Sequence, residues 1–578
     1  MSDLPWLTVL GVLPLVGAAL VAALPTRLAR PLALATSLVV LLGTIAMCAA
    51  FDPDGARFQF VQAHDWIPAF GVQYAVGVDG IALVLVALVA VLVPVVLLAS
   101  WHDADPVGSE ASGEVEATVA QSAGAPATAS ATAGGGSTGS GAGGSVALAE
   151  RPTGGSAGRG TVADAGTTAP GGRHLRSVKT FFALLLVLET LMIGVFAATD
   201  VFLFYVFFEA VLIPMYFLIG SYGGPRRSYA AVKFLLYSLV GGLLMLAAVI
   251  GLYVTSAQSS PTSQGTFAFE ELTQLEISTP VQIALFSGFF IAFAIKAPLF
   301  PFHTWLPDSG AEAPVGVAVL LVGVLDKIGT FGFLRYCLPL FPDASRILAP
   351  YVITLSVIGI LYGALLAMGQ KDMKRLVSYT SVAHFGFIGL GCFAFTTQAQ
   401  TGAVFYMVNH GLSTGALFLV VGFLVVRGGS RSVDDYSGIA KVAPVLAGFF
   451  LVAGLSSLAL PGLSTFVSEF LVLLGSWQRY PVATVFATVG IVFAALYVLL
   501  LFQRTMQGEI QDRHLRMPDL SGREVLAVAP LIALMLVLGF YPRPVLDVIA
   551  PAVQATMEDV GAQDPAPTVS TAVDEEGR

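Results

Sequence analysis

Charged residues are scarce in this chain. Asp, Glu, Lys and Arg together make up 11% of its 578 residues, whereas hydrophobic residues make up 56%. Soluble domains usually carry about 25% charged residues, so the composition excludes an ordinary soluble protein and predicts an integral membrane protein. The formal net charge of −9 is small for this length and gives no reason to expect a nucleic-acid partner.

Cysteine is rarer still. The three cysteines, Cys48, Cys337 and Cys392, lie far apart in apolar runs, and no Cys-x-x-Cys pair is present. This pattern argues against iron–sulfur clusters, c-type haem and zinc fingers. The first residues, Met1-Ser2-Asp3, also lack the positive charge of a cleavable signal peptide, so the first apolar run is predicted to be a retained span.

Long apolar runs are abundant. A helix needs about 20 apolar residues to cross the ~30 Å hydrocarbon core of a bilayer. Such runs cover residues 6–24, 31–50, 78–99, 177–198, 200–220, 229–254, 281–302, 314–338, 346–369, 375–396, 401–426, 443–478, 482–505 and 524–548. The twelfth is too long for one straight helix and is interrupted at Pro461-Gly462. We therefore predict an all-α membrane protein with about fourteen transmembrane helices.

Residues 102–176, between spans three and four, differ in composition. They are rich in Gly, Ala, Ser and Thr and have few large apolar side chains. Because such a segment cannot bury a core, it is predicted to form a disordered cytoplasmic loop. Gly139-x-Gly141-x-x-Gly144 matches a dinucleotide-binding fingerprint, but no strand precedes it and no helix is expected after it, so it is not interpreted as a nucleotide site.

Lysine and arginine are distributed unevenly between the loops. With the N-terminus outside, 20 of the 28 basic residues fall in inside loops, six fall outside, and Lys296 and Lys327 lie within spans. Because basic residues accumulate on the cytoplasmic side, both termini are predicted to lie on the outer side of the membrane.

Ionisable residues nevertheless occur inside the predicted spans. A charge at the bilayer centre costs ~2.5–3.5 kcal/mol even on the insertion scale, so each one needs an explanation. The residues are Glu189, Glu209, Lys296, Asp326, Lys327, His384, His410 and Glu469. At about 1.5 Å per residue along a helix, several lie near mid-depth on different helices, and together they can form a polar row in the membrane plane.

Each of these residues also has a structural interpretation. A single membrane histidine more often bridges two helices by a hydrogen bond, and Glu209 alone could serve as an ion-pair partner. A buried lysine, however, needs a charged partner or loses its proton. With Glu209 and Glu469 available as acids for Lys296 and Lys327, a proton relay is favoured over structural pairing.

Three further residues receive no firm role in the relay. Glu189 and Asp326 remain open between a relay and a structural role. His303 lies beside the proline pair of span seven, where packing or hydrogen bonding is favoured over a place on an access path.

Helix breakers accompany two of the charges. Pro298 and Pro301 follow Lys296 in span seven, and Pro461-Gly462 precedes Glu469 in span twelve. Proline frees a backbone carbonyl, which membrane proteins tolerate where the backbone lines a hydrated cavity. Interrupted helices in the two halves of a transporter point to the transport site, so spans seven and twelve are both predicted to be discontinuous.

The broken spans also suggest how the chain is organised. Spans four to eight and nine to thirteen form two five-span units in which the two broken spans correspond. The predicted parts are spans one to three (1–101), the loop 102–176, a first repeat (177–338), a second repeat (346–507), span fourteen with its preceding loop (508–548) and a polar tail (549–578).

Six segments, in order, resemble one family. They are FFEAVLIPMYFLIG (207–220), FAIKAPLFPFHTWLPDSGAEAP (293–314), LDKIGTFGFLRY (325–336), KRLVSYTSVAHFGFIGL (374–390), NHGLSTGALF (409–418) and GLSTFVSEFLVLLGSW (462–477). They resemble the antiporter-like, proton-pumping subunits of respiratory complex I, and most closely the M type of bacterial NADH-quinone oxidoreductase (chain 4 type). The resemblance covers nearly all of the chain outside 102–176 and the tail, and the glycine-rich insert departs from the family pattern.

This resemblance implies a fourteen-helix fold with two inverted five-helix repeats and a proton-transfer role for six residues. Glu209 and Lys296 are implied to be the ion pair of the inner half-channel, Lys327 and His384 the central relay, His410 its flank, and Glu469 the outer end of the path. Glu469 favours the M type, because L-type, N-type and cation/proton antiporter subunits usually carry lysine there. Asp326 is a variable feature that can hold Lys327 charged.

The resemblance also implies partners and cofactors. The chain is expected in a bacterial cell membrane beside L- and N-type subunits, moving protons as part of an NADH-oxidising, quinone-reducing enzyme. No cofactor, metal or redox centre is expected in this chain, whereas NAD, FMN, iron–sulfur clusters and quinone are expected in partner subunits. Two alternatives remain, a cation/proton antiporter subunit and the membrane subunit of a related hydrogenase complex.

Overall fold

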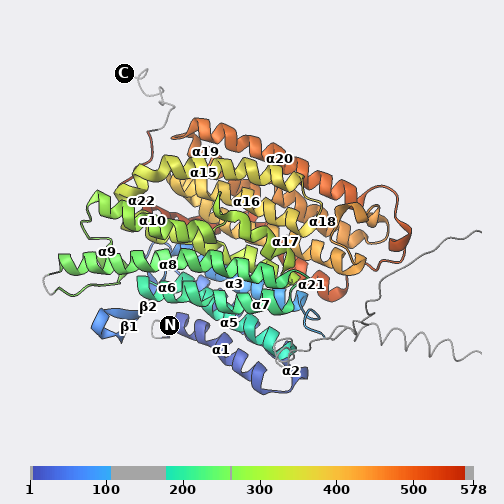
Figure 1. Ribbon diagram of the computed structural model, residues 1–578, viewed down its shortest axis with the longest axis horizontal. Helices are drawn as coiled ribbons and strands as arrows, with labels where there is room; N and C mark the ends of the chain where they lie inside the picture. Colours follow the sequence, from blue (N-terminus) through green and yellow to red (C-terminus); the bar gives the residue numbers. More distant parts are fainter. Residues whose placement is uncertain (1–3, 106–176, 261–262, 567–578) are drawn as a thin grey trace, which may run out of the picture. The chain divides into compact units, whose positions relative to one another are not determined.

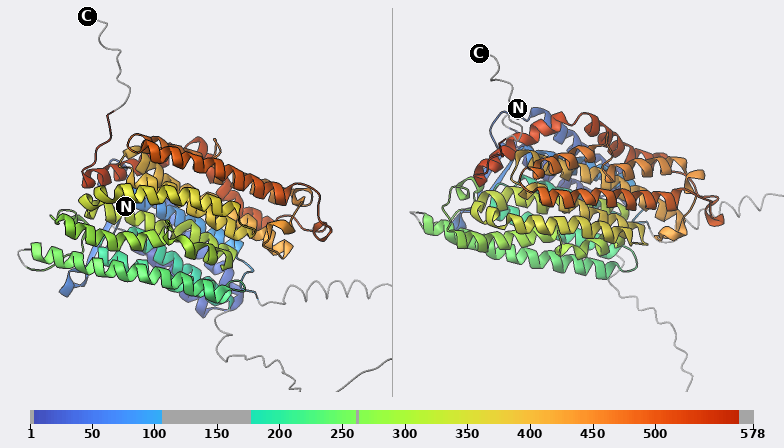
Figure 2. Two further views of the ribbon diagram at one scale, coloured as in Figure 1. Left: turned by 45° about the horizontal axis from the view of Figure 1, so that its top comes forward. Right: turned by 90° about the horizontal axis from the view of Figure 1, so that it is seen from above.

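The computed structural model describes residues 4–105, 177–260 and 263–566. Within these ranges most of the chain is helical, and the helices lie side by side in one bundle (Figures 1 and 2). The predicted loop 102–176 falls outside the described residues from residue 106 onward.

Thirteen helical segments of the described chain are long and apolar enough to cross a membrane. They are α1 (Trp6–Ala23), α2 (Thr26–Ala50), α3 (Gly80–Ala99), α5 (Val178–Ala197), α6 with α7 (Val201–Ala210 and Leu212–Tyr222), α8 (Arg227–Ser259), α10 (Thr279–Lys296), α12 to α14 (Val315–Leu340), α15 (Pro342–Met368), α16 (Met373–Phe393), α17 (Thr397–Gly428), α20 (Pro481–Met506) and α21 (Gly522–Phe540). Two shorter apolar helices, α18 (Pro444–Ser457) and α19 (Ser464–Trp477), take the place of the twelfth predicted span. Thirteen segments and this divided one make fourteen, which confirms the predicted helical class and number of spans.

Both predicted breaks are present. The helix α10 ends at Lys296, and the chain continues through a 3-10 turn (Phe302–Trp305) into the short helix α11 (Leu306–Glu312). The second break separates α18 from α19, and there Gly462 has a φ of 93°, a left-handed conformation that glycine adopts without steric cost. Prolines at both breaks remove backbone donors and end the helices.

Two further irregularities were not predicted, although Pro214, which has no N–H to bond to the Ala210 carbonyl, marks the first of them. Span five is interrupted at Val211, two residues after Glu209, where α6 gives way to α7. Span eight alternates between α-helix and π-helical turns: α12 (Val315–Leu320), a π turn (Leu321–Leu325), α13 (Lys327–Gly332), a second π turn (Phe333–Cys337) and α14 (Leu338–Leu340). π turns occur frequently at functional sites, and the first one here ends immediately before Asp326 and Lys327.

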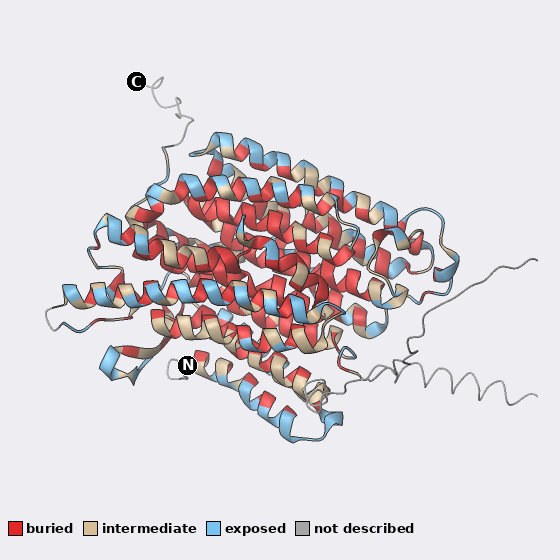
Figure 3. Ribbon diagram, viewed as in Figure 1, coloured by how far each residue is buried: buried red, intermediate tan, exposed pale blue. Residues whose placement is uncertain are grey.

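The surface of the bundle is apolar. Figure 3 shows buried positions along the middle of the molecule and exposed ones along the outer faces of α8 and α20. The exposed side chains include Leu236 and Val240 on α8 and Val485 and Val492 on α20. Apolar faces of this kind suit lipid or a neighbouring membrane protein rather than water.

The bundle carries elements at its ends that were not predicted. An antiparallel hairpin, β1 (Gln59–Ile67) and β2 (Val72–Val78), joined by a 3-10 turn (Pro68–Phe70), connects α2 to α3. The short helix α9 (Phe269–Leu272) precedes α10, and further 3-10 turns lie at Val433–Asp435, Ile439–Lys441 and Asp512–His514.

Span fourteen is shorter than predicted. The helix α21 ends at Phe540 rather than near 548, because the residue before Pro542 is biased away from helical geometry. A separate helix, α22 (Arg543–Val560), follows where a polar tail was expected to begin. It is amphipathic, burying Ile549 and Val553 against the bundle and exposing Gln554. The start of α1 and the helix α22 lie at the same end of the bundle (Figure 1).

Candidate functional site

Lys327 is the centre of a buried polar cluster. Its Nζ lies 2.5 Å from Nδ1 of His410 on α17 and 3.1 Å from Oδ1 of the neighbouring Asp326. The ammonium also donates to the carbonyl of Val322, in the preceding π turn. Lys327, Asp326 and His410 are completely buried. The π turn therefore supplies a carbonyl acceptor beside the carboxylate, and both stabilise a charge that would otherwise be costly at this depth.

His384, on α16, continues the cluster. Its ring centroid lies 5.3 Å from that of His410, with the two rings nearly perpendicular. Its Nε2 lies 3.1 Å from the carbonyl of Ser457, the last residue of α18, directly before the break in span twelve. Because a carbonyl can only accept, Nε2 carries the proton and Nδ1 is left as an acceptor. The break thus supplies the partner that orients His384.

Tyr406 joins these histidines to Glu469. Its ring centroid lies 5.8 Å from that of His384, and its hydroxyl donates to Oε2 of Glu469, on α19, at 3.4 Å. Glu469 is almost fully buried. The sequence interpretation missed Tyr406, although a signal existed: it precedes His410 by four residues, which places both on one face of α17.

Lys296 and Glu209 are arranged differently from the ion pair that the resemblance implies. Lys296 Nζ donates to the carbonyl of Phe208 at 3.4 Å and lies 4.5 Å from the centre of the Phe208 ring. Glu209 interacts with Lys296 electrostatically, but no N–O contact of 4.0 Å or less between them occurs in the described chain. The ammonium and the carboxylate are neighbours that do not form a direct ion pair.

The Glu209 carboxylate instead lies on the backbone of α8. Its Oε1 occupies the position that a Cβ on Gly242 would take. Glycine at 242 therefore makes room for the carboxylate, and any larger residue would displace it.

The segments that carry Lys296 and Lys327 pack against each other. The helix α13, which begins with Lys327, packs on the end of α10, where a Cβ on Gly329 would collide with Phe293 and Ala297 backbone atoms. Helices in such close contact bring the two lysine-bearing segments together.

The remaining ionisable residues differ in whether they contact the cluster around Lys327. Asp326 belongs to the cluster, through Lys327. Glu189, on α5, is fully buried, and neither carboxylate oxygen has a hydrogen-bond partner among the described residues, so nothing ties it to the cluster. His303 packs between Phe300 and Tyr362, with ring centroids 5.9 and 5.4 Å away, in agreement with the packing interpretation.

A set of ion pairs surrounds the short helix α11. Asp308 contacts Lys233 Nζ of α8 at 2.8 Å and Arg375 Nη1 of α16 at 2.5 Å. Burial by itself raises the pKa of Asp308, but the hydrogen bonds and charges of these two cations outweigh it and lower that pKa overall. Glu312, at the end of α11, contacts Arg431 at 3.1 Å. These bonds attach the segment after the first break to helices from both predicted repeats.

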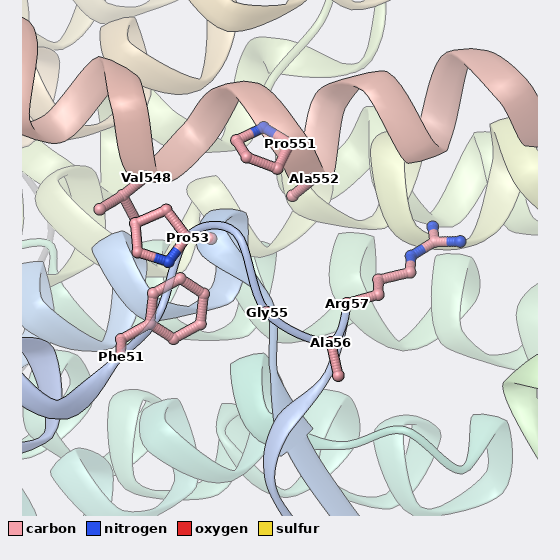
Figure 4. Close-up of a pocket in the computed structure, with 9 residues that line it drawn as sticks. Phe51, Pro53, Gly55, Ala56, Arg57, Val548, Pro551 and Ala552 are labelled. Carbon is pink, nitrogen blue, oxygen red and sulfur yellow. The ribbon is translucent and has the colours of Figure 1, made fainter.

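No group of three or more His, Cys, Asp or Glu side chains able to hold a metal ion occurs among the described residues. A pocket of about 150 Å³ lies between the loop that follows α2 and the helix α22 (Figure 4). Its lining includes Phe51, Pro53 and Pro551 but none of the cluster residues, and the Arg57 guanidinium turns away from it toward Asp559, 2.8 Å distant.

Known proteins share this sequence and fold. The family described as "NADH:quinone oxidoreductase/Mrp antiporter, TM" matches residues 198–494. NADH-quinone oxidoreductase subunit M of Mycobacterium tuberculosis is 49% identical over 99% of this chain and 97% of its own length. The protein of the same name from Rhodobacter capsulatus is 35% identical over 96% of this chain and 97% of its own length.

Solved structures share the fold of this chain. A chain of respiratory complex I from Thermus thermophilus with bound NADH has a TM-score of 0.77 and 29% sequence identity, covering 96% of this chain and all of that one. A chain of the Mrp complex from Dietzia has a TM-score of 0.71 over 97% of this chain and 53% of its own length, and at 22% identity it shows the fold alone.

Proposed function

The chain belongs to the NADH-quinone oxidoreductase subunit M family, and we propose that it translocates protons across the membrane within that enzyme. It is a multi-pass membrane subunit, and its partners are other membrane subunits of complex I. Electron transfer from NADH to quinone in partner subunits supplies the energy for the movement of protons.

The observation that carries this proposal is the buried contact between Lys327 and His410. The lysine has three polar partners in an otherwise apolar interior. His384, Tyr406 and Glu469 extend the line from there. A purely structural role for the Lys327 charge would need only one partner of opposite charge. A line of titratable groups on α13, α17, α16 and α19 instead suits stepwise proton transfer.

The proposed path has three parts. Glu209 and Lys296 take up protons from the inner side, Lys327 with His410 and His384 forms the centre, and Glu469 releases protons to the outer side. The gap between Glu209 and Lys296 supports a switching role. A lysine deprived of its carboxylate partner in an apolar environment gives up its proton more readily, and closing the pair reverses this.

The free energy of opening a buried ion pair is comparable to the cost of moving a charge against the membrane potential. Moving one charge against 100 mV costs about 2.3 kcal/mol, and removing one partner from a buried ion pair costs about 3–5 kcal/mol. Opening and closing one pair can therefore drive a proton against an ordinary membrane potential.

The surroundings proposed for the chain follow from the family. Its neighbours are L- and N-type antiporter-like subunits, and NAD, FMN, iron–sulfur clusters and quinone are held by other subunits. The membrane is the bacterial cell membrane, and both termini lie on its outer side. The start of α1 and the helix α22 lie at one end of the bundle, which supports termini on the same side (Figure 1).

The inverted relation of the two five-helix repeats is likewise proposed. It is supported by the corresponding breaks, between α10 and α11 in one unit and between α18 and α19 in the other.

Isolation of the native assembly tests the proposed function. The chain should co-purify with flavin-containing subunits that oxidise NADH, and the assembly should acidify the lumen of inside-out vesicles when NADH is added. A chain that purifies without any NADH-oxidising partner would instead support a stand-alone antiporter.

A further inference from the structure

Tyr406 places a buried hydroxyl group between the central histidines and Glu469. The side chain lies on α17 and is fully buried. Its ring contacts His384, and its hydroxyl donates to the Glu469 carboxylate. No direct hydrogen bond joins His384 to Glu469 in the described chain, because His384 Nδ1 has no partner and Nε2 is taken by Ser457. Tyr406 is thus the polar group that spans this interval.

We propose that Tyr406 carries the proton from His384 to Glu469, a step that rests on the proposed function. A phenol can donate and accept at the same oxygen. Protonated His384 gives the proton on Nδ1 to the Tyr406 oxygen, directly or through a bridging water molecule. At the same time the phenol gives its own proton to Glu469. The imidazolium becomes imidazole, the carboxylate becomes a carboxylic acid, Tyr406 ends neutral, and no electron moves.

A packing role does not account for the hydroxyl group. The ring of Tyr406 also lies 6.3 Å from that of Phe387, and phenylalanine would make the same ring contacts. An unneeded hydroxyl in an apolar interior lowers stability unless it is hydrogen-bonded. In this protein its hydrogen bond goes to a titratable group rather than to a backbone carbonyl.

Tyr497 offers a matched control. It lies on α20, is 1% exposed and is near enough to Glu469 to interact with it electrostatically. Its hydroxyl, however, has no hydrogen-bond partner among the described residues. Replacing each tyrosine by phenylalanine therefore removes one buried hydroxyl beside Glu469, but only Tyr406→Phe removes a link to it.

The test uses the assembled enzyme in proteoliposomes, with protons translocated per NADH oxidised as the readout. Tyr406→Phe should lose as much pumping as Glu469→Gln, and Tyr497→Phe should pump like the wild type. Because groups acting in series are not additive, the double variant Tyr406→Phe/Glu469→Gln should be no worse than Glu469→Gln alone. The infrared carbonyl band of protonated Glu469 should shift in Tyr406→Phe and stay in place in Tyr497→Phe.

Several results would overturn the role of Tyr406 while leaving the proposed function intact. One is normal pumping by Tyr406→Phe when Glu469→Gln is impaired. Another is an equal loss in the two phenylalanine variants, which would indicate packing. A third is an additive loss in the double variant, which would indicate separate routes. If Glu469→Gln and Lys296→Ala also pump normally, the proposed function itself is wrong.

Discussion

Nζ of Lys327 lies 2.5 Å from Nδ1 of His410, and both side chains are completely buried. When Lys327 is protonated, its ammonium donates to Nδ1 of His410 and so links α13 to α17. Asp326 balances the charge from the other side of the ammonium. The ammonium has three N–H donors and three acceptors, the Val322 carbonyl, the Asp326 carboxylate and His410, and of these only the histidine lies on another helix.

This arrangement predicts a separation between assembly and pumping. Lys327→Met leaves the Asp326 carboxylate buried without a cation, which should destabilise the chain by about 3–5 kcal/mol and reduce the amount of assembled enzyme. The double variant Lys327→Met/Asp326→Asn removes both charges and should restore assembly without restoring pumping. Quantifying the complex by native electrophoresis and pumping in proteoliposomes checks both. A double variant that pumps normally would remove Lys327 from the path.

Gly242 should control the position of Glu209. In Gly242→Ala the added methyl group takes the place of the Glu209 carboxylate oxygen. The end of a flexible side chain can move away, and alanine favours a helix over glycine by about 1 kcal/mol, so assembly should be normal. Pumping should fall because the Glu209 carboxylate is displaced from its position against α8.

Gly448→Ala is the control for this substitution. Gly448 also lies within a helix, α18, and has no atom within 4 Å of an added Cβ. It should leave pumping unchanged. Equal pumping by Gly242→Ala and Gly448→Ala would mean that the observed position of Glu209 is unimportant.

Asp308 should stabilise the end of the bundle at which α11 lies. Asp308→Asn removes the carboxylate charge from its hydrogen bonds with Lys233 and Arg375, each worth about 1.5–3 kcal/mol when a charged group is involved. Asp547→Asn, which affects the exposed pair with Arg543, should cost at most about 1 kcal/mol. Thermal unfolding of the detergent-solubilised enzyme distinguishes the two variants.

Comparison of the wild type with Asp308→Asn also tests how this stabilisation depends on pH. The pKa of Asp308 is lowered in the folded chain, so its stabilisation is fully present above the ordinary carboxyl pKa of about 3.9 and is lost as the pH falls through the lowered value. The difference in melting temperature between wild type and Asp308→Asn should therefore stay constant from about pH 6 to pH 9. A difference that changes across this range would contradict the assigned ion pairs.

Glu469 should need a titratable side chain. Glu469→Gln keeps the hydrogen bond from Tyr406 but cannot exchange a proton, so pumping should fall. Glu469→Asp should keep partial activity, as should Glu469→Lys, since lysine is the residue implied for the related subunits. Proton translocation by the three variants gives the comparison. Wild-type pumping by Glu469→Gln would place the exit of the path elsewhere.

Much of this arrangement could be predicted from the sequence. Proline and glycine are local signals, so the breaks after Lys296 and before Glu469 were evident, as were the spans, whose length and apolarity are fixed by the bilayer. The π turn beside Lys327 was not predictable, because the single Gly323 within it does not distinguish a π turn from a continuous helix. Tyr406 was missed because an aromatic residue in an apolar helix is ordinary until its hydroxyl is seen on Glu469. The position of the Glu209 carboxylate against Gly242 was not predictable, because only folding brings α6 and α8 together.

The central claim is that protons cross the membrane through the buried row of this chain. The most direct measurement is the number of protons translocated per NADH oxidised, in proteoliposomes containing enzyme with Glu209→Gln, Lys296→Ala or the control Glu276→Gln, an exposed carboxylate outside the spans. The account predicts normal assembly in all three, a clear decrease in pumping for Glu209→Gln and Lys296→Ala, and wild-type pumping for Glu276→Gln. Full pumping by either Glu209→Gln or Lys296→Ala would contradict it.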